Sequence, residues 1–141
     1  MKRTTLLRAA ASILLVGARS STSAPRHAGT CSPSLETMAA SRNLPYQFLD
    51  QGLESLRALY PEHRLLLARR DGHLGRVEYS LLVYQETPAA DSAQIAGAAV
   101  VGDRAWSVAA TCPMSELPEG LVATMEAIAA LPRLSEPPAP P

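Results

Sequence analysis

The fold is decided by the stretch QIAGAAVVGDRAWSVAATC, residues 94–112. Two runs of small and apolar residues flank Gly102-Asp103 there, and such a pair is typical of a two-residue hairpin turn. If Gly102-Asp103 is the turn, the bulky side chains of Trp106 and Val108 lie opposite the small residues Ala99 and Gly97, as close packing requires. Cys112 falls on the same face as Trp106 and is expected to point into the core. The turn sets four pairs: Val101 with Arg104, Ala99 with Trp106, Gly97 with Val108, and Ile95 with Ala110.

The opposite face of the predicted hairpin is built from small side chains. Alternation along the two strands places there Ala96, Ala98, Val100, Ala105, Ser107 and Ala109. Leu82 and Tyr84, two larger residues of the preceding strand, border this face. A surface this smooth fits either a helix that packs on it, which we favour, or a groove that accepts a partner. The candidate ligand-binding or partner-binding residues are therefore Leu82, Tyr84, Ala96, Ala98, Val100 and Ala105.

Two further strands are predicted before this hairpin. Residues 65–68 form an apolar run that ends at Asp71-Gly72, a pair typical of a turn. Residues 77–86 predict the next strand, which completes an antiparallel meander and is followed by a loop at residues 88–91. Its core-facing side chains alternate along the chain: Val77, Tyr79, Leu81 and Val83.

Two helices are expected before the sheet. Ser32 has the character of an N-cap and Pro33 that of a first helical residue, which predicts a short helix over residues 33–42. The second helix begins at Pro45 and is stopped by Pro61, with Gly52 as a weak point in its middle. It is expected to lie on the sheet, because its apolar stripe has helical spacing: Leu49, Leu53, Leu56 and Tyr60.

A last helix follows the sheet. Ser115 is its predicted N-cap, acidic residues in its first turn suit the positive end of the helix dipole, and Pro132 stops it. Its apolar stripe consists of Leu117, Leu121, Met125 and Ile128.

This order of elements predicts a single α+β domain over residues 32–134. An antiparallel sheet of about four strands is flanked by N-terminal and C-terminal helices. Residues 25–31 are expected to form a flexible leader. Residues 135–141 contain four prolines and are expected to form a disordered tail.

The first 24 residues have the pattern of a secretory signal peptide. Basic residues stand at the start, a largely apolar segment covers residues 9–16, and small residues follow. Cleavage after Ala18 and cleavage after Ala24 both suit the small-residue rule. The apolar segment is less than half of the roughly 20 residues that a membrane-spanning helix needs, so no stable membrane anchor is expected after cleavage. The expected location is periplasmic or secreted.

Export would leave an acidic chain. Without residues 1–24 there are 9 basic residues against 13 acidic ones, a net charge of −4, and no lysine. Binding to a phosphate backbone needs several clustered cations. The composition therefore argues against nucleic acid as a partner.

The chain also resembles a known family. Its order of elements is similar to that of the PsbP-like superfamily, which has exported DcrB-like and LpqN-like members. The similar features are a helix that ends near a proline, a Gln-initiated strand that runs into Gly102-Asp103-Arg104, an aromatic strand that ends in Ala110-Thr111-Cys112-Pro113, and a closing amphipathic helix. Residues 94–131 carry the resemblance most clearly. It implies a sheet flanked by helices that serves as a non-catalytic binding or accessory module. The family has no shared catalytic residues to carry over, and this chain lacks the lipidation cysteine of many exported relatives.

The residues that could carry chemistry are few. Cys31 and Cys112 are the two cysteines, and in an exported protein they form either one disulfide or two free thiols. His27, His63 and His73 have no metal-ligand spacing, so no metal site is expected. Neither a Gly-rich phosphate loop nor a Gly-x-Ser-x-Gly motif occurs, and no cofactor is expected.

The sequence therefore predicts a non-catalytic exported binding or accessory protein whose partner is an unknown protein or an apolar ligand. One alternative is a small thiol-dependent enzyme that uses Cys112 with His63 or His73 as its base. Another is a purely structural envelope protein.

Overall fold

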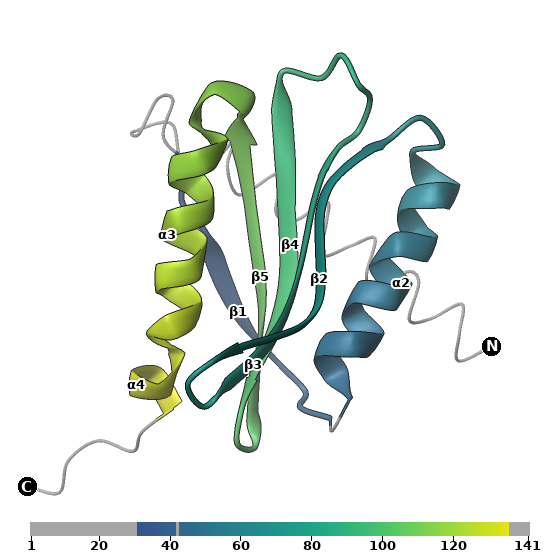
Figure 1. The fold of residues 1–141 in the computed structure, drawn as a ribbon. Coiled ribbons are helices and arrows are strands. Elements are labelled where there is room, and N and C mark those ends of the chain that lie inside the picture. Colours follow the sequence, from purple (N-terminus) through teal and green to yellow (C-terminus); the bar gives the residue numbers. More distant parts are fainter. Residues whose placement is uncertain (1–30, 42, 136–141) are drawn as a thin grey trace, which may run out of the picture.

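The computed structural model describes residues 31–41 and 43–135, and it shows a five-stranded antiparallel sheet with helices on both faces (Figure 1). The predicted α+β single domain is confirmed. The predictions for the signal peptide, for residues 25–30 and for residues 136–141 lie outside the described residues. The strand order is β1-β5-β4-β3-β2, with β1 Ser34–Met38, β2 Arg64–Leu74, β3 Val77–Gln85, β4 Ser92–Val101 and β5 Arg104–Pro113.

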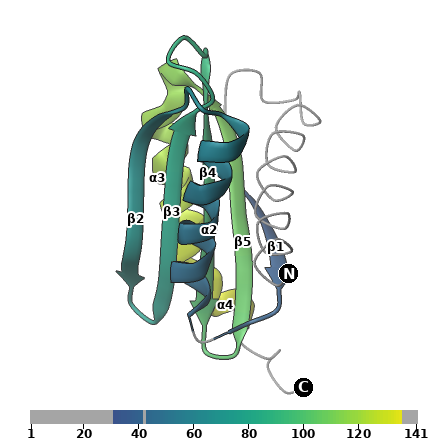
Figure 2. The ribbon, with the colours of Figure 1, turned by 90° about the vertical axis from the view of Figure 1, so that its right-hand side faces the viewer.

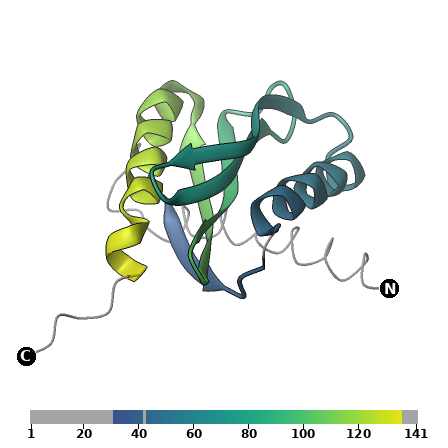
Figure 3. The same ribbon diagram turned by 60° about the horizontal axis from the view of Figure 1, so that its bottom comes forward.

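The helices form two layers on opposite sides of the sheet (Figure 3). Helix α2, Leu44–Leu59, packs on β2, β3 and β4 on one side. Helix α3, Leu117–Ala129, and the short helix α4, Leu131–Ser135, lie on the other side. Within the described residues, no helix is both long and apolar enough to cross a membrane.

The predicted hairpin register is confirmed. Val101 pairs with Arg104 across Gly102-Asp103, Ala99 pairs with Trp106, and the same register continues to Ile95 opposite Ala110. Gly102 has φ +59°, so the turn has glycine at its first central position, as the type II′ hairpin requires. The main core lies between this side of the sheet and α3, and includes Tyr79, Leu81, Val83, Ile95, Trp106, Val108 and Ile128.

The helix predicted over residues 33–42 is wrong, because this segment holds strand β1. Leu35 lies opposite Val108 of β5 and packs against the main core. The Ser32-Pro33 pair is a local helix signal, but a bare edge of β5 offers the segment backbone partners and a place for Leu35. This fifth strand was absent from the predicted sheet.

The turn predicted at Asp71-Gly72 is also wrong, because β2 continues to Leu74. The pair lies where the β2–β3 register shifts, and the chain reverses at Gly75-Arg76, with Gly75 at φ +60°. Gly72 lies opposite Tyr79, and a Cβ atom at Gly72 would overlap the tyrosine ring. The glycine therefore makes room for an aromatic ring to lie across the edge strand.

Helix α2 matches the second predicted helix and crosses the smooth face of the sheet (Figure 2). Gly52, expected as a weak point, packs closely against β3: a Cβ atom there would lie 3.2 Å from Leu82 Cδ2. Hydrogen bonds fix the same helix to the edge strand β2, from Arg70 to Asp50 at 3.3 Å and from Tyr46 to Asp71 at 3.1 Å.

The predicted apolar stripe of the last helix is confirmed, since its residues pack against the main core. Its predicted N-cap is wrong: Ser115 lies in a 3₁₀ turn, Met114–Glu116, and α3 is preceded by Glu116, with no capping side-chain hydrogen bond. Pro132 does not end the helix either. It lies inside α4, whose first residue, Leu131, is fully buried in the core.

Candidate functional site

Helix α2 covers most of the candidate binding residues. Phe48, Leu49 and Leu56 of α2 form a second hydrophobic cluster with the sheet. The sheet residues of this cluster are Leu82, Tyr84, Ala96 and Ala98, each at most 1% exposed. These four side chains therefore pack against α2. Of the two alternatives for the smooth face, a helix that packs on it and an open groove, they correspond to the first.

The two remaining candidates, Val100 and Ala105, do not belong to the cluster that α2 forms with the sheet. Ala105 is 2% exposed and lies in β5 between Met38 of β1 and Val100 of β4. Val100 is half-buried and pairs on its other side with Glu78 of β3. Of the six candidates, Val100 is the one that lines an open hollow of the surface.

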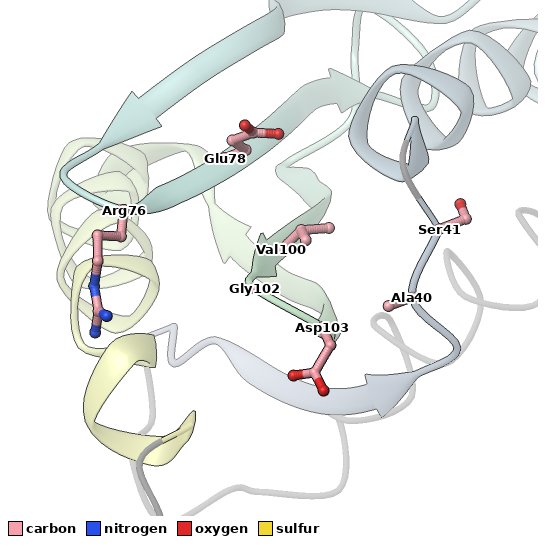
Figure 4. A pocket seen from close by; sticks show the side chains of 7 residues that line it. All are labelled: Ala40, Ser41, Arg76, Glu78, Val100, Gly102 and Asp103. Atoms are coloured by element: carbon pink, nitrogen blue, oxygen red, sulfur yellow. The ribbon is translucent and has the colours of Figure 1, made fainter.

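This hollow has a volume of about 570 Å³, within the usual range for small-ligand sites of roughly 300 to 1,000 Å³. Three segments that are distant in the sequence bring its walls together. They are the link between β1 and α2, the start of β3 with the turn before it, and the end of β4 with the turn after it (Figure 4). The lining residues are Ala40, Ser41, Arg76, Glu78, Val100, Gly102 and Asp103.

Val100 and Ala40 are apolar lining residues of the hollow, and Arg76, Glu78 and Asp103 are the charged ones. Figure 4 shows Val100 in the middle, Glu78 and Asp103 on opposite sides of it, and Arg76 at a third side. Within residues 31–41 and 43–135, none of the three forms an ion pair of 4.0 Å or less. With respect to the described residues, the lining of the hollow thus contains two unpaired carboxylates and one unpaired guanidinium.

Helix α2 begins at the edge of the hollow. The Leu44 amide donates a hydrogen bond to the Ser41 carbonyl at 3.2 Å, and Asn43 makes no side-chain capping bond. The first turn of α2 contains no acidic residue. The positive end of the helix dipole is therefore not neutralised by its own side chains.

Cys31 and Cys112 form a disulfide, the first of the two arrangements that the sequence left open. The β1–β5 register, counted outward from Ser34 opposite Ala109, brings the two cysteines directly opposite each other. Their Cα atoms are 4.9 Å apart, within the range of roughly 4.5 to 5.5 Å for opposed residues of antiparallel strands. Gly120 of α3 lies on this bond, and a Cβ atom there would overlap both sulfur atoms.

The disulfide leaves Cys112 without the free thiol that a thiol-dependent enzyme needs. A cysteine nucleophile must be a reduced and accessible thiolate, whereas Cys112 is oxidised and fully buried. The bases suggested for it have other neighbours. His63 Nδ1 lies 2.7 Å from the Tyr60 carbonyl oxygen, and His73 Nδ1 lies 3.5 Å from the Asp71 carboxylate.

No metal site is evident in the part of the chain that the structure describes, where no three His, Cys, Asp or Glu side chains gather closely enough to hold an ion. His27 lies outside that part.

The resolved pKa shifts belong to the contacts of α2: burial raises the pKa of Tyr84, and the hydrogen bond to Asp71 raises the pKa of Tyr46. Neither tyrosine lines the hollow.

Comparison with known proteins identifies a shared fold. The chain is similar to the crystal structure of a protein of unknown function, PA94 from Pseudomonas aeruginosa, with a TM-score of 0.52 and 17% identity. The match covers 79% of this chain and 74% of that one. No protein-family model matches the sequence, and no curated protein does.

The likeness to PA94 concerns the fold alone at this identity. The site residues therefore have to be judged from their own geometry. The alternation along β4 pointed to Val100. The charged lining residues Arg76, Glu78 and Asp103 were missed, because no local sequence pattern connects residues 76 and 78 with residue 103.

Proposed function

We propose that this chain is an exported, non-catalytic binding or accessory protein that offers the hollow beside Val100 to its partner or ligand. The observation that carries the proposal is the position of Val100. Val100 belongs to the smooth face but not to the cluster that α2 forms with it, and among the described residues it lines an open hollow together with three charged side chains. A concave surface that combines apolar and polar side chains is a usual setting for a binding site.

The compartment has separate support. The disulfide is consistent with an oxidising, extracytoplasmic compartment, since disulfides are rare in the cytosol. The signal-peptide pattern of residues 1–24 points the same way. The resemblance to the PsbP-like superfamily, whose members are exported accessory modules, supports the finer reading of a periplasmic or secreted protein.

Photo-crosslinking tests the binding part of the proposal. A photoreactive amino acid replaces Ser41, an exposed lining residue, in the full-length chain expressed in a bacterium with a periplasm. The matched control carries the same amino acid at Thr87, which is exposed in the loop between β3 and β4. We expect a protein or small-molecule adduct at Ser41 and none at Thr87, measured by mass spectrometry. No adduct at Ser41, or the same adduct at both positions, contradicts the proposal.

Cell fractionation of the same cultures tests the export part. The expected product is a shortened chain in the periplasm or the medium whose cysteines resist alkylation until a reductant is added. A full-length, reduced chain in the cytoplasm would contradict export.

A further inference from the structure

We infer that the outer edge of strand β2 binds an extended, acidic segment of a partner protein, which adds to the sheet as a further strand. β2 is the edge strand opposite β1, and Figure 2 shows it at the outer border of the sheet, beyond β3. Residues 64–69 of this edge do not line the hollow, so the inference goes beyond the proposed function.

The free side of β2 carries backbone groups that can pair with another chain. In an antiparallel strand, alternate residues turn their N–H and C=O groups toward one neighbour, and the residues between them turn theirs to the other side. β2 pairs with β3 alone, and within the described ranges no backbone hydrogen bond of a turn, loop or cap involves residues 64–74. An extended segment can bond to such an edge, which is recognition by β-strand addition.

A β-bulge puts two arginines of this edge on the same face of the sheet. Arg64 lies opposite Gln85 of β3. Arg69 lies opposite Leu81, four residues before Gln85. Because side chains alternate along β3, Arg64 and Arg69 share a face, about 13 Å apart at roughly 3.3 Å per residue. Without the register shift between them, two residues five apart would point to opposite faces.

An apolar side chain lies between the two arginines. Leu67 is opposite Val83, midway between the rows of Arg64 and Arg69, and it packs half-buried at the border of the main core. A strand added to this edge therefore meets a cation, a leucine and a second cation along one face. The complementary segment has an acidic, an apolar and an acidic residue at alternate positions.

The charges of the edge favour an acidic partner over a second copy of this chain. Arg64 and Arg69 are exposed, and neither forms an ion pair of 4.0 Å or less with a described residue. Antiparallel pairing of two β2 strands over this stretch would place Arg64 of one copy opposite Arg69 of the other, and like charges directly opposite each other are destabilising. Cations on an edge strand commonly prevent self-association, and the same cations attract a strand that carries carboxylates.

Three peptides of seven residues, capped at both ends, test the charges and the backbone separately. TETVTET has the acidic pattern, TKTVTKT has lysines in place of the acids, and the third peptide is TETVTET with N-methyl groups on its three central residues. Each is titrated at low salt into the ¹⁵N-labelled, oxidised protein. TETVTET should shift the amide signals of Leu65, Leu67 and Ala68, and TKTVTKT should bind about ten-fold more weakly. The N-methylated peptide should cause no shifts, because it cannot donate hydrogen bonds to the edge.

Charge-reversing variants assign the contacts. The double variant Arg64→Glu with Arg69→Glu should reverse the preference and bind TKTVTKT about ten-fold more tightly than TETVTET. Arg64→Gln alone should weaken TETVTET about three-fold at unchanged Tm, since it leaves the hydrogen bond from Arg69 to the Tyr79 hydroxyl in place. The matched control is Arg104→Glu, which reverses an exposed arginine of β5 and should leave the preference unchanged.

Several results would overturn the inference. They are equal binding of TETVTET and TKTVTKT, equal binding of the N-methylated and the parent peptide, shifts that lie outside β2 and β3, and no shifts at about 5 mM peptide. Shifts in β2 that grow with protein concentration alone would assign the edge to a second copy and would overturn it as well. Crosslinking at Ser41 concerns the hollow, so failure of the peptide experiment leaves the proposed function standing.

Discussion

Loss of the Cys31–Cys112 bond should remove a large part of the stability of this domain. The bond joins residues 81 apart in the sequence. Closing a loop of that length lowers the entropy of the unfolded chain, which corresponds to about 4.5 kcal/mol at 25 °C in the chain-entropy model. Native domains have only about 5 to 15 kcal/mol in total. Reduction should therefore remove between about a third and nine-tenths of the free energy of unfolding.

The loss should appear first in β1. This strand has five residues, it lies at the edge of the sheet, and its apolar residues Leu35 and Met38 are only partly buried. Without the disulfide it keeps its pairing with β5 but loses its covalent anchor at Cys31. Amide hydrogen exchange in β1 should then become faster than in β3 and β4 under native conditions.

Guanidinium denaturation of three samples measures the effect: the oxidised protein, the same protein with a reductant, and the C31A/C112A variant. The reduced sample isolates the cross-link, and the variant adds the loss of the buried sulfur atoms. We expect a drop of about 4.5 kcal/mol for reduction, or on the order of 20 °C in Tm. A drop below about 1 kcal/mol, or uniform exchange across the sheet, would refute the reasoning.

Three other substitutions probe the packing. Gly120→Ala should cost about 1 to 3 kcal/mol in the oxidised protein, because its methyl group overlaps the disulfide, and less in C31A/C112A; equal costs in denaturant titrations would place the clash elsewhere. Ala98→Asp buries a carboxylate under α2 and should cost about 3 kcal/mol or more, against about 0.5 or less for exposed Thr87→Asp; similar thermal stabilities would mean that α2 leaves this face open. Since burial raises the pKa of Tyr84, its contribution to stability is intact below about pH 10 and declines above it by about 1.4 kcal/mol per pH unit, a slope that Tyr84→Phe should reduce in urea titrations at pH 9 to 11; an unchanged slope would contradict this origin.

The parts of the fold that local chemistry determines could be predicted from the sequence. A two-residue turn at Gly102-Asp103 fixes which residues lie opposite each other, and it also predicted Cys112 on the core side. Helix α2 followed from one apolar stripe between two prolines. In both cases the signal and the structure involve neighbouring residues.

The parts of the fold that depend on contacts between distant residues could not be predicted from the sequence. Ser32-Pro33 has the same local signal whether or not β5 has a free edge, and strand β1 exists because that edge is available. Asp71-Gly72 has turn chemistry but lies inside a strand, because Gly72 accommodates the ring of Tyr79. The hollow was the hardest feature to predict, because its walls come from three segments that are distant in the sequence. Of its lining residues, only Val100 followed from the alternation of side chains along a strand.

The disulfide has a mechanical consequence as well. Cys31 precedes β1 and Cys112 lies next to the last residue of β5, so the covalent ring encloses all five described strands and α2. A pulling force on the two chain ends would be carried by the sulfur–sulfur bond and would bypass the sheet. One protease cut in an enclosed loop, such as residues 88–91, would leave both fragments joined. The segments that line the hollow lie on both sides of such a cut, and the disulfide would keep them covalently joined.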